Sequence, residues 1–140
     1  MVFTRSIAVG PTSWPSERRI KAAGLVEVVF ERAHAKVNLA LHVLARRDDG
    51  YHLMDSLAVF ADLADDLSLH PAPESSLEIS GPFADAIPET RLDDNILGKT
   101  IRAFHHATGL DGYYAIRLEK NIPVAAGIGG GSADAAGMLH

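Results

Sequence analysis

KNIPVAAGIGGGSADAA, residues 120–136, is the stretch that decides the fold. Four of the five residues from Gly127 to Gly131 are glycines, and a run of alanines that favours a helix follows at once. Glycine permits positive φ and close approach of a ligand to the backbone, although each glycine costs conformational entropy on folding. Ser132 is a good N-cap residue, so we expect the loop to end at a helix N-terminus, where unpaired N–H groups favour an anion. Phosphate is the natural candidate.

Three familiar phosphate motifs do not fit this loop. A P-loop requires a lysine before its final serine or threonine, and here Gly131 stands directly before Ser132. The dinucleotide fingerprint requires glycine at its first, third and sixth positions, and the sixth position counted from Gly127 is Ser132. The glycine loop of protein kinases fails at the same place. A flexible linker is the plain alternative, against which Pro123 and the flanking alanines argue.

The bulk composition fits one soluble globular domain. The chain has 140 residues, of which 47% are apolar, and no cysteine, which excludes disulfide scaffolds, thiolate metal sites and cysteine nucleophiles. Thirteen Lys and Arg against eighteen Asp and Glu give a net charge of -5, so a nucleic-acid partner lacks its usual basic surface. Because neither a long apolar run nor a signal peptide is present, we expect a cytoplasmic protein with no membrane partner.

The pattern of apolar residues predicts an α+β domain. Residues 1–23 show neither strand nor helix periodicity, and we expect them to form a mobile N-terminal extension before a domain that covers residues 24–140. The predicted helices begin at Ile96, with Gly109 as the stop, and at Ser132. Strands are predicted at 25–30, 35–44, 52–60, 67–70, 77–80 and 113–118, with a tight turn at 46–50 and a β-meander over the first half.

Polar residues alternate with apolar ones along the strand predicted at 35–44. Its odd positions through Val43 are apolar, whereas Lys36, Asn38 and His42 occupy even positions. A period of two places these three side chains on one face of the strand. A solvated strand face is the ordinary interpretation of this pattern, because lysine is mostly exposed in folded proteins.

The loop resembles the phosphate loop of the GHMP kinases, the small-molecule kinases named for galactose, homoserine, mevalonate and phosphomevalonate kinases. Their general pattern is Pro-x-x-x-Gly-Leu-Gly-Ser-Ser-Ala, and a Gly-Gly-Gly-Ser version is typical of one branch, which serves the non-mevalonate route to isoprenoid precursors. That branch also carries Ala-Lys-x-Asn-Leu and Asp-Gly-Tyr-His, found here at 35–39 and 49–52. Three motifs in family order make the resemblance specific, and it covers essentially everything after the N-terminal extension.

The resemblance implies both a fold and a reaction. The fold would be of the ribosomal protein S5 domain 2-like type, a mixed or antiparallel sheet with helices packed on it. The reaction would be ATP-dependent phosphorylation of an alcohol, with Mg²⁺ sharing the charge of the phosphates. The substrate would be a small molecule with a cytidine diphosphate group. A GHMP kinase for a different alcohol is the nearest alternative, and a non-catalytic nucleotide-binding or structural fragment is the second.

The resemblance also implies residues on the substrate side. Lys36 would be catalytic, because an ammonium there can offset charge on the transferring phosphoryl group. Asn38 would line the same pocket, although a polar residue that merely fills the strand face is as good an interpretation. Tyr51 and His52 would hold the cytosine, the tyrosine through its ring face and the histidine through hydrogen bonds.

On the nucleotide side, Asn95 would lie near the adenine and Lys120 just before the loop. The plain alternatives are a helix-start asparagine and a solvated lysine at a strand end. Relatives often have glycine where Ala125 and Ala126 stand, and we expect a negative φ for both alanines. The ATP-binding residues implied by the motif itself are Pro123, Val124, Ala125, Ala126, Gly127, Ile128, Gly129, Gly130, Gly131, Ser132 and Ala133.

This sequence lacks two features of the family. Relatives carry a catalytic aspartate a few tens of residues beyond the loop and then a second domain, whereas this sequence ends at His140. Asp134 lies in the loop and helix motif, where the family commonly has Asn or Asp, so we do not expect it to replace that aspartate. We expect the chain to be the N-terminal half of a longer kinase and to be inactive alone. No metal other than Mg²⁺ is expected, because no histidine pair has zinc-site spacing.

Overall fold

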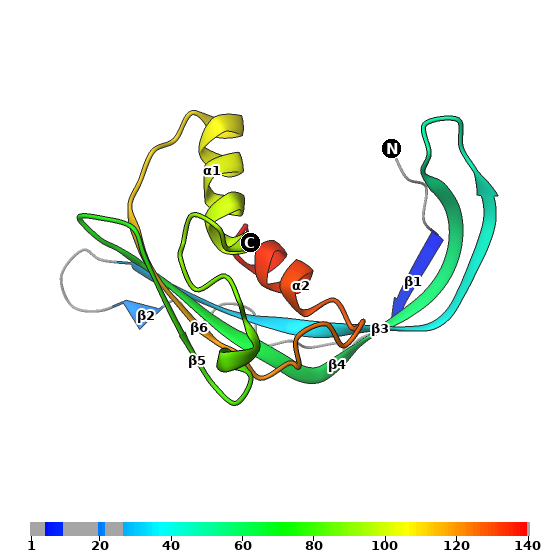
Figure 1. Ribbon diagram of the computed structural model, residues 1–140, viewed down its shortest axis with the longest axis horizontal. Coiled ribbons are helices and arrows are strands. Elements are labelled where there is room, and N and C mark those ends of the chain that lie inside the picture. The colour runs from blue at the N-terminus through cyan, green and yellow to red at the C-terminus, as the bar shows by residue number, and fades with distance from the viewer. Residues whose placement is uncertain (1–4, 10–19, 22–26, 140) are drawn as a thin grey trace.

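The computed structural model describes residues 5–9, 20–21 and 27–139. In this part of the chain a six-stranded sheet carries two α-helices on one face (Figure 1). Neither of these helices is long and apolar enough to cross a membrane. The elements in chain order are β1 (Arg5–Val9), β2 (Ile20–Lys21), β3 (Glu27–Arg46), β4 (His52–Pro71), β5 (Ser76–Ser80), the 3₁₀ helix η1 (Ala84–Ala86), α1 (Ile96–Thr108), β6 (Tyr114–Glu119) and α2 (Gly130–Gly137).

β3 and β4 form one long hairpin. Each strand has 20 residues and absorbs two strands that the sequence pattern predicted separately. The predicted turn is confirmed, because Gly50 has a φ of 86° and its N–H donates to the Arg47 carbonyl at 3.0 Å. The stretches between the predicted strands, 31–34 and 61–66, are rich in charged residues, yet the ladder largely continues through them.

The ladder between β3 and β4 shifts register at three places, one of them between Asn38 and Ala40. An extra residue in one strand reverses the face that each following side chain occupies. Asn38 pairs with Ala58, whereas His42, beyond the shift, pairs with Asp55. Even and odd positions of β4 lie on opposite faces, so the prediction that His42 shares the face of Asn38 is wrong. The prediction assumed a strict period of two along the strand and did not include the bulge.

The sheet is mixed, in the order β2-β3-β4-β6-β5. β6 is antiparallel to β4 and parallel to β5, and parallel neighbours require a crossover connection. α1 supplies that crossover and thereby covers one face of the sheet (Figure 1). The meander predicted for the first half is therefore wrong beyond β4, because β6 separates β5 from β4.

Two strands fall within the N-terminal extension, where none was predicted. β1 runs parallel to β4 at residues 55–59, and β2 is antiparallel to β3 at its first residues. The predicted mobility of residues 1–4, 10–19 and 22–23 concerns a part of the chain outside the described residues.

The hydrophobic core lies between the sheet and the two helices. α1 begins and ends as predicted, with Gly109 in the left-handed conformation (φ 69°) after its last residue. Full burial of a leucine such as Leu67 contributes about 1.5–3 kcal/mol. This packing fixes the N-terminus of α2 above β3 and β4. The buried core residues are Ala33, Leu67, Leu97, Ile116 and Leu118, against which Ile101, Ala133 and Met138 pack.

Candidate functional site

The glycine loop leads from β6 into α2, and its last residue before the helix is Gly129. Gly129 has a φ of 76°, and its carbonyl accepts the N–H of Ala133 at 2.8 Å. The helix therefore starts at Gly130, and Ser132 is its third residue. The prediction that Ser132 caps the helix is wrong. A glycine at 129 reaches the left-handed conformation without steric cost, and this allows the helix to begin almost one turn earlier.

The start of α2 offers unpaired backbone donors. The N–H groups of Gly130, Gly131 and Ser132 precede the first intrahelical hydrogen bond, and no side chain caps this end. A Cβ added at Gly127 or Gly131 would meet no atom within 4 Å, so the loop is open on that side. Unpaired N–H groups and the helix dipole together favour an anion in that open space.

Ala125 has a φ of 59°, so the prediction of a negative φ there is wrong. It is the only residue other than glycine with a positive φ in the described part of the chain. Gly127 and Gly129 follow at 74° and 76°. Left-handed residues interspersed in this way turn neighbouring N–H groups inward and form concavities that suit anions. For an L-alanine the conformation costs roughly 1–2 kcal/mol.

A cavity of about 360 Å³ lies beside the loop. It brings together Asn95, Lys120 and most of the loop residues predicted to bind a nucleotide. Of the predicted loop residues, Ile128 and Ala133 are not in its wall. The wall is formed by residues 87–89, 95–96, 118, 120, 123–127, 129–132 and 134.

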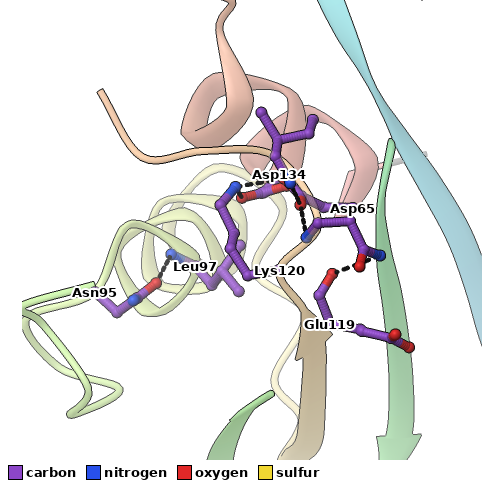
Figure 2. Close-up of polar contacts among 8 residues, drawn as sticks. Asp65, Asn95, Leu97, Glu119, Lys120 and Asp134 are labelled. Atoms are coloured by element: carbon purple, nitrogen blue, oxygen red, sulfur yellow. Dashed lines mark hydrogen bonds and ion pairs between the residues drawn. The ribbon is translucent and has the colours of Figure 1, made fainter. Parts of the chain in front are cut away.

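Lys120 is the centre of a buried polar cluster below the loop (Figure 2). Only 3% of Lys120 is exposed, and its ammonium donates to Asp65 and, at 2.9 Å, to Asp134. The other carboxylate oxygen of Asp65 accepts the N–H groups of Asn121 at 2.6 Å and Ile122 at 2.7 Å. The alternative of a solvated lysine is thereby excluded. The cluster fastens the start of the loop to β4.

Asp65 is the residue of this cluster that the sequence analysis missed. Asp62, Asp65 and Asp66 lie within one acidic stretch, and no motif separates them. Asp65 has no exposed surface, whereas the side chain of Asp62 is 96% exposed. Alternation with Leu67, two residues along β4, was the available signal, because it puts Asp65 on the face that packs against the helices.

Asp134 is buried, and burial raises the pKa of its carboxyl to about 7. The Lys120 ammonium lowers this pKa and the neighbouring Asp65 carboxylate raises it, but desolvation is the largest effect. Its Oδ1 atom is buried without a hydrogen-bond partner among the described residues. The carboxyl therefore changes charge near neutral pH.

Asn95 is the N-cap of α1. Its side-chain oxygen accepts the N–H of Leu97 at 2.9 Å (Figure 2). Its amide nitrogen donates to the Glu89 carbonyl at 2.8 Å. The helix-start interpretation is confirmed, and Asn95 also lies in the cavity wall.

Lys36 lies on β3 beside the glycine loop. Its backbone N–H donates to the Ile128 carbonyl at 3.0 Å. A Cβ added at Gly129 would lie 4.0 Å from the Lys36 Cβ, so the exposed lysine side chain starts next to the glycine turn that precedes α2. The structure thus brings together Lys36 and the loop, which the sequence placed more than 80 residues apart.

Asn38 follows two residues along on β3 and accepts a hydrogen bond from Ser56 at 3.4 Å. Tyr51 and His52 lie at the far end of the hairpin, and both are exposed. The ten residue steps from Lys36 to Arg46 span at most about 33 Å of strand. The hairpin end bends toward the side of the sheet that carries the helices (Figure 1). The structure therefore does not place Tyr51 and His52 in contact with the loop.

The face of β3 between these two ends is apolar. Because of the bulge after Asn38, Leu41 and Val43 occupy the face of Asn38, and they are 46% and 59% exposed. An elongated ligand held at both ends would cover them.

Comparison of the sequence with known proteins identifies relatives of this chain. The model of the GHMP kinases N terminal domain matches residues 95–140. The 4-diphosphocytidyl-2-C-methyl-D-erythritol kinase of Paramagnetospirillum magneticum is 57% identical over 76% of this chain and 36% of its own length. The enzyme of the same name from Methylorubrum extorquens is 53% identical over 82% of this chain and 39% of its own length. The chain therefore spans less than two fifths of these relatives.

Solved structures give the same answer for the fold. The crystal structure of a 4-(cytidine 5'-diphospho)-2C-methyl-D-erythritol kinase superposes with a TM-score of 0.58 at 40% identity, over 79% of this chain and 38% of that one. A homoserine kinase from Cytophaga hutchinsonii superposes at 0.57 with 15% identity, over 80% of this chain and 33% of that one, which supports the fold alone. The α+β fold, the glycine loop and these matches together lead to one conclusion: the chain belongs to the GHMP kinases and has the fold of their N-terminal domain.

Proposed function

We propose that the chain carries the ATP-binding part of a kinase that transfers the γ-phosphoryl group of ATP to the 2-hydroxyl of 4-diphosphocytidyl-2-C-methyl-D-erythritol. The observation that carries the proposal is the hydrogen bond between Lys36 and Ile128, because it sets an exposed lysine beside an open anion cradle. The names of the relatives at 57% and 53% identity supply the substrate. Isoprenoid precursor synthesis in the cytoplasm is the corresponding cellular role.

The glycine loop would bind the phosphates of ATP. The N–H groups of Gly130, Gly131 and Ser132 point into open space at the helix start, and the cavity beside them has room for the rest of a nucleotide. ATP supplies the phosphoryl group, and Mg²⁺ shares the charge of its phosphates. Holding the phosphates in a fixed position orients the γ-phosphoryl group toward the hydroxyl that attacks it.

Lys36 would act on the transferring group itself. Negative charge on the phosphoryl oxygens is spread over the transition state, and an ammonium positioned beside it stabilises that charge. The backbone hydrogen bond to Ile128 keeps the strand that carries Lys36 in register with the loop. The lysine is thereby oriented before the substrate binds.

Tyr51 and His52 would bind the cytosine end of the substrate. Both are exposed at the end of the hairpin, and the path back to Lys36 runs along one curved strand face that carries Asn38. The tyrosine ring offers an apolar face to the base, and the histidine offers hydrogen bonds. A nucleoside diphosphate joined to a small polyol has the elongated shape that this arrangement requires.

The test is substrate selection by the intact protein. We expect ATP-dependent phosphorylation of 4-diphosphocytidyl-2-C-methyl-D-erythritol, detected as the mass of the product, and none of mevalonate or homoserine. Tyr51→Ala should raise the KM for the cytidine substrate and leave the KM for ATP unchanged. Tyr113→Ala removes an equally exposed tyrosine, 63% against 65%, and should change neither.

Phosphorylation of another alcohol in place of the cytidine substrate would overturn the substrate assignment. The absence of phosphorylation of all three alcohols by the intact protein would overturn the kinase assignment. We expect the isolated 140-residue chain to show no turnover, because it spans less than two fifths of its relatives.

A further inference from the structure

The cluster below the glycine loop contains more acid than base. Three side chains from separate elements, Asp65 of β4, Lys120 after β6 and Asp134 of α2, meet with exposures of 0%, 3% and 2% (Figure 2). Two carboxylates share one ammonium. If all three were ionised, one negative charge would be buried without a countercharge, which is costly in a protein interior.

The hydrogen bonds identify which carboxyl carries the excess charge. Asp65 receives donors at both oxygens, from Lys120 at one and from the N–H groups of Asn121 and Ile122 at the other. Asp134 receives Lys120 at Oδ2 only, and its Oδ1 is buried without a partner among the described residues. A proton that neutralises the cluster therefore belongs on Asp134, whose pKa burial raises to about 7.

No further charge from the surrounding elements alters this balance. The charged groups that act on the Asp134 carboxyl are the Lys120 ammonium and the Asp65 carboxylate. Glu31 of β3 faces α2 further along the helix, at Gly137. Glu89 also lines the cavity, but it is exposed and is not among the groups that shift the Asp134 pKa. The apolar Leu97 and Ile101 of α1 and loop residues 121–129 contribute no charged side chain.

The cluster adjoins the space that the phosphates would occupy. Lys120 and Asp134 both line the cavity beside the loop. The Lys120 Nζ atom lies 3.0 Å from the position that a Cβ on Gly130 would take, directly below the first turn of α2. With Asp134 ionised, the cluster carries a net charge of -1 and opposes an anion at the helix start, whereas with Asp134 protonated the cluster is neutral and this repulsion is removed.

We propose that Asp134 is a positioning residue of the nucleotide site, which acts through Lys120, and that a nucleotide binds together with one proton taken up from solvent onto the Asp134 carboxyl. The proton forms an O–H bond on Asp134, so the carboxyl charge changes from -1 to 0 as the phosphate charge arrives. Asp65 keeps its carboxylate and continues to hold Lys120 and the start of the loop. This inference rests on the proposed function only in that the pocket binds a nucleotide.

The test measures the dissociation constant of ADP with MgCl₂ on the intact protein from pH 5.5 to 9, by calorimetry in buffers of different ionisation enthalpy. Wild type should take up close to one proton at pH 8 and close to none at pH 5.5. Its dissociation constant should rise by up to about tenfold per pH unit above pH 7. Asp134→Asn keeps the oxygen that faces Lys120 and removes the titration, so its binding should be nearly independent of pH in that range.

Asp62→Asn changes an exposed aspartate and should keep the wild-type profile. The titration of ADP itself is the same in all three proteins and cancels in the comparison. Equal proton uptake by wild type and Asp134→Asn would overturn the inference while leaving the nucleotide site intact. Absence of ADP binding to both proteins at every pH, with both folded by circular dichroism, would instead overturn the nucleotide site itself and this inference with it.

Discussion

The N–H of Lys36 donates to the carbonyl of Ile128 at 3.0 Å, and this hydrogen bond joins the strand that carries the lysine to the loop that offers the anion cradle. Among the described residues β2 pairs with β3 only at Glu27 and Val28, so no strand lies on that side of β3 at Lys36. The hydrogen bond therefore gives this backbone N–H a partner outside the sheet, and any displacement of β3 is transmitted to the cradle.

Replacing Lys36 with Met should lower kcat of the intact protein on the order of 10²–10³-fold, with little change in the KM for ATP. The loss follows from removing a positive charge that acts in the transition state. Steady-state kinetics at saturating substrate measure it. Lys99→Met, an exposed lysine on α1, is the matched control and should keep full turnover. Equal turnover of Lys36→Met and wild type would remove Lys36 from catalysis.

Replacing Ala125 with Gly should stabilise the fold by about 0.5–1 kcal/mol. The gain from relieving a left-handed alanine exceeds the entropy that glycine adds to the unfolded chain. Ala126 has no positive φ, so Ala126→Gly should cost about 0.5–1 kcal/mol through that entropy alone. Urea unfolding of the two variants measures the opposite signs. A loss of stability in Ala125→Gly would contradict the left-handed loop.

Gly98→Ala should destabilise the fold by about 3 kcal/mol, because the added Cβ would lie 1.9 Å from the Leu92 carbonyl oxygen. Backbone must move to accommodate it. Gly131→Ala adds the same methyl group in α2, where nothing lies within 4 Å, and should be neutral or stabilising by up to about 1 kcal/mol. Thermal unfolding of the pair separates a clash from the general effect of replacing a helical glycine. Equal melting temperatures for the two variants would refute the close packing of α1 against the segment before it.

Asp65→Ala should destabilise the fold by about 2–4 kcal/mol, because it leaves the N–H groups of Asn121 and Ile122 without their acceptor and removes one of the two carboxylates that hold Lys120. Asp62→Ala breaks only an exposed ion pair with Arg32 at 3.7 Å and should cost less than about 0.5 kcal/mol. Chemical denaturation of both variants tests the difference. A cost for Asp65→Ala as small as that of its neighbour would show that the cluster is not buried.

The contribution of Asp134 to the stability of wild type should fall as the pH rises from about 4 to about 7. Folding raises the pKa of Asp134 from 3.8 to about 7, so within this window the folded chain binds a proton that the unfolded chain does not. The stabilisation is complete below pH 3.8 and is lost as the pH passes 7, at on the order of 1 kcal/mol per pH unit. Asp134→Asn lacks this dependence. Its free energy of unfolding should therefore rise relative to that of wild type between pH 5 and pH 8. Parallel profiles for the two proteins would contradict the shift.

Local signals in the sequence predicted the parts of the fold that depend on neighbouring residues. The limits of α1 follow from Asn95 and Gly109, and the hairpin turn follows from the Asp49-Gly50 pair. The register of β3 does not follow from such signals, because the bulge near Leu39 depends on pairing with a distant strand. The position of β6 between β4 and β5 likewise depends on the crossover through α1. No local signal within β6 predicts which strands it pairs with.

The same distinction between local signals and distant contacts applies to the residues of the candidate site. Motifs identified Lys36 and the loop, since each lies in a contiguous pattern, whereas Asn95 and Lys120 were predicted from the family resemblance. Asp65 escaped because it comes from an acidic stretch 55 residues before its partner Lys120. The helix start at Gly130 escaped because the capping rule favours a serine side chain over a glycine backbone conformation.

The bulge between Asn38 and Ala40 also changes which positions along β3 share a face of the sheet. Before it, side chains on the face of Lys36 and Asn38 occupy even positions, and after it they occupy odd ones as far as Val43, where a further shift follows. A single-residue deletion between the two ends would turn Leu41 and Val43 to the opposite face while Lys36 kept its place. Small insertions and deletions in β3 thus change the side chains presented toward the hairpin end while Lys36 stays beside the loop.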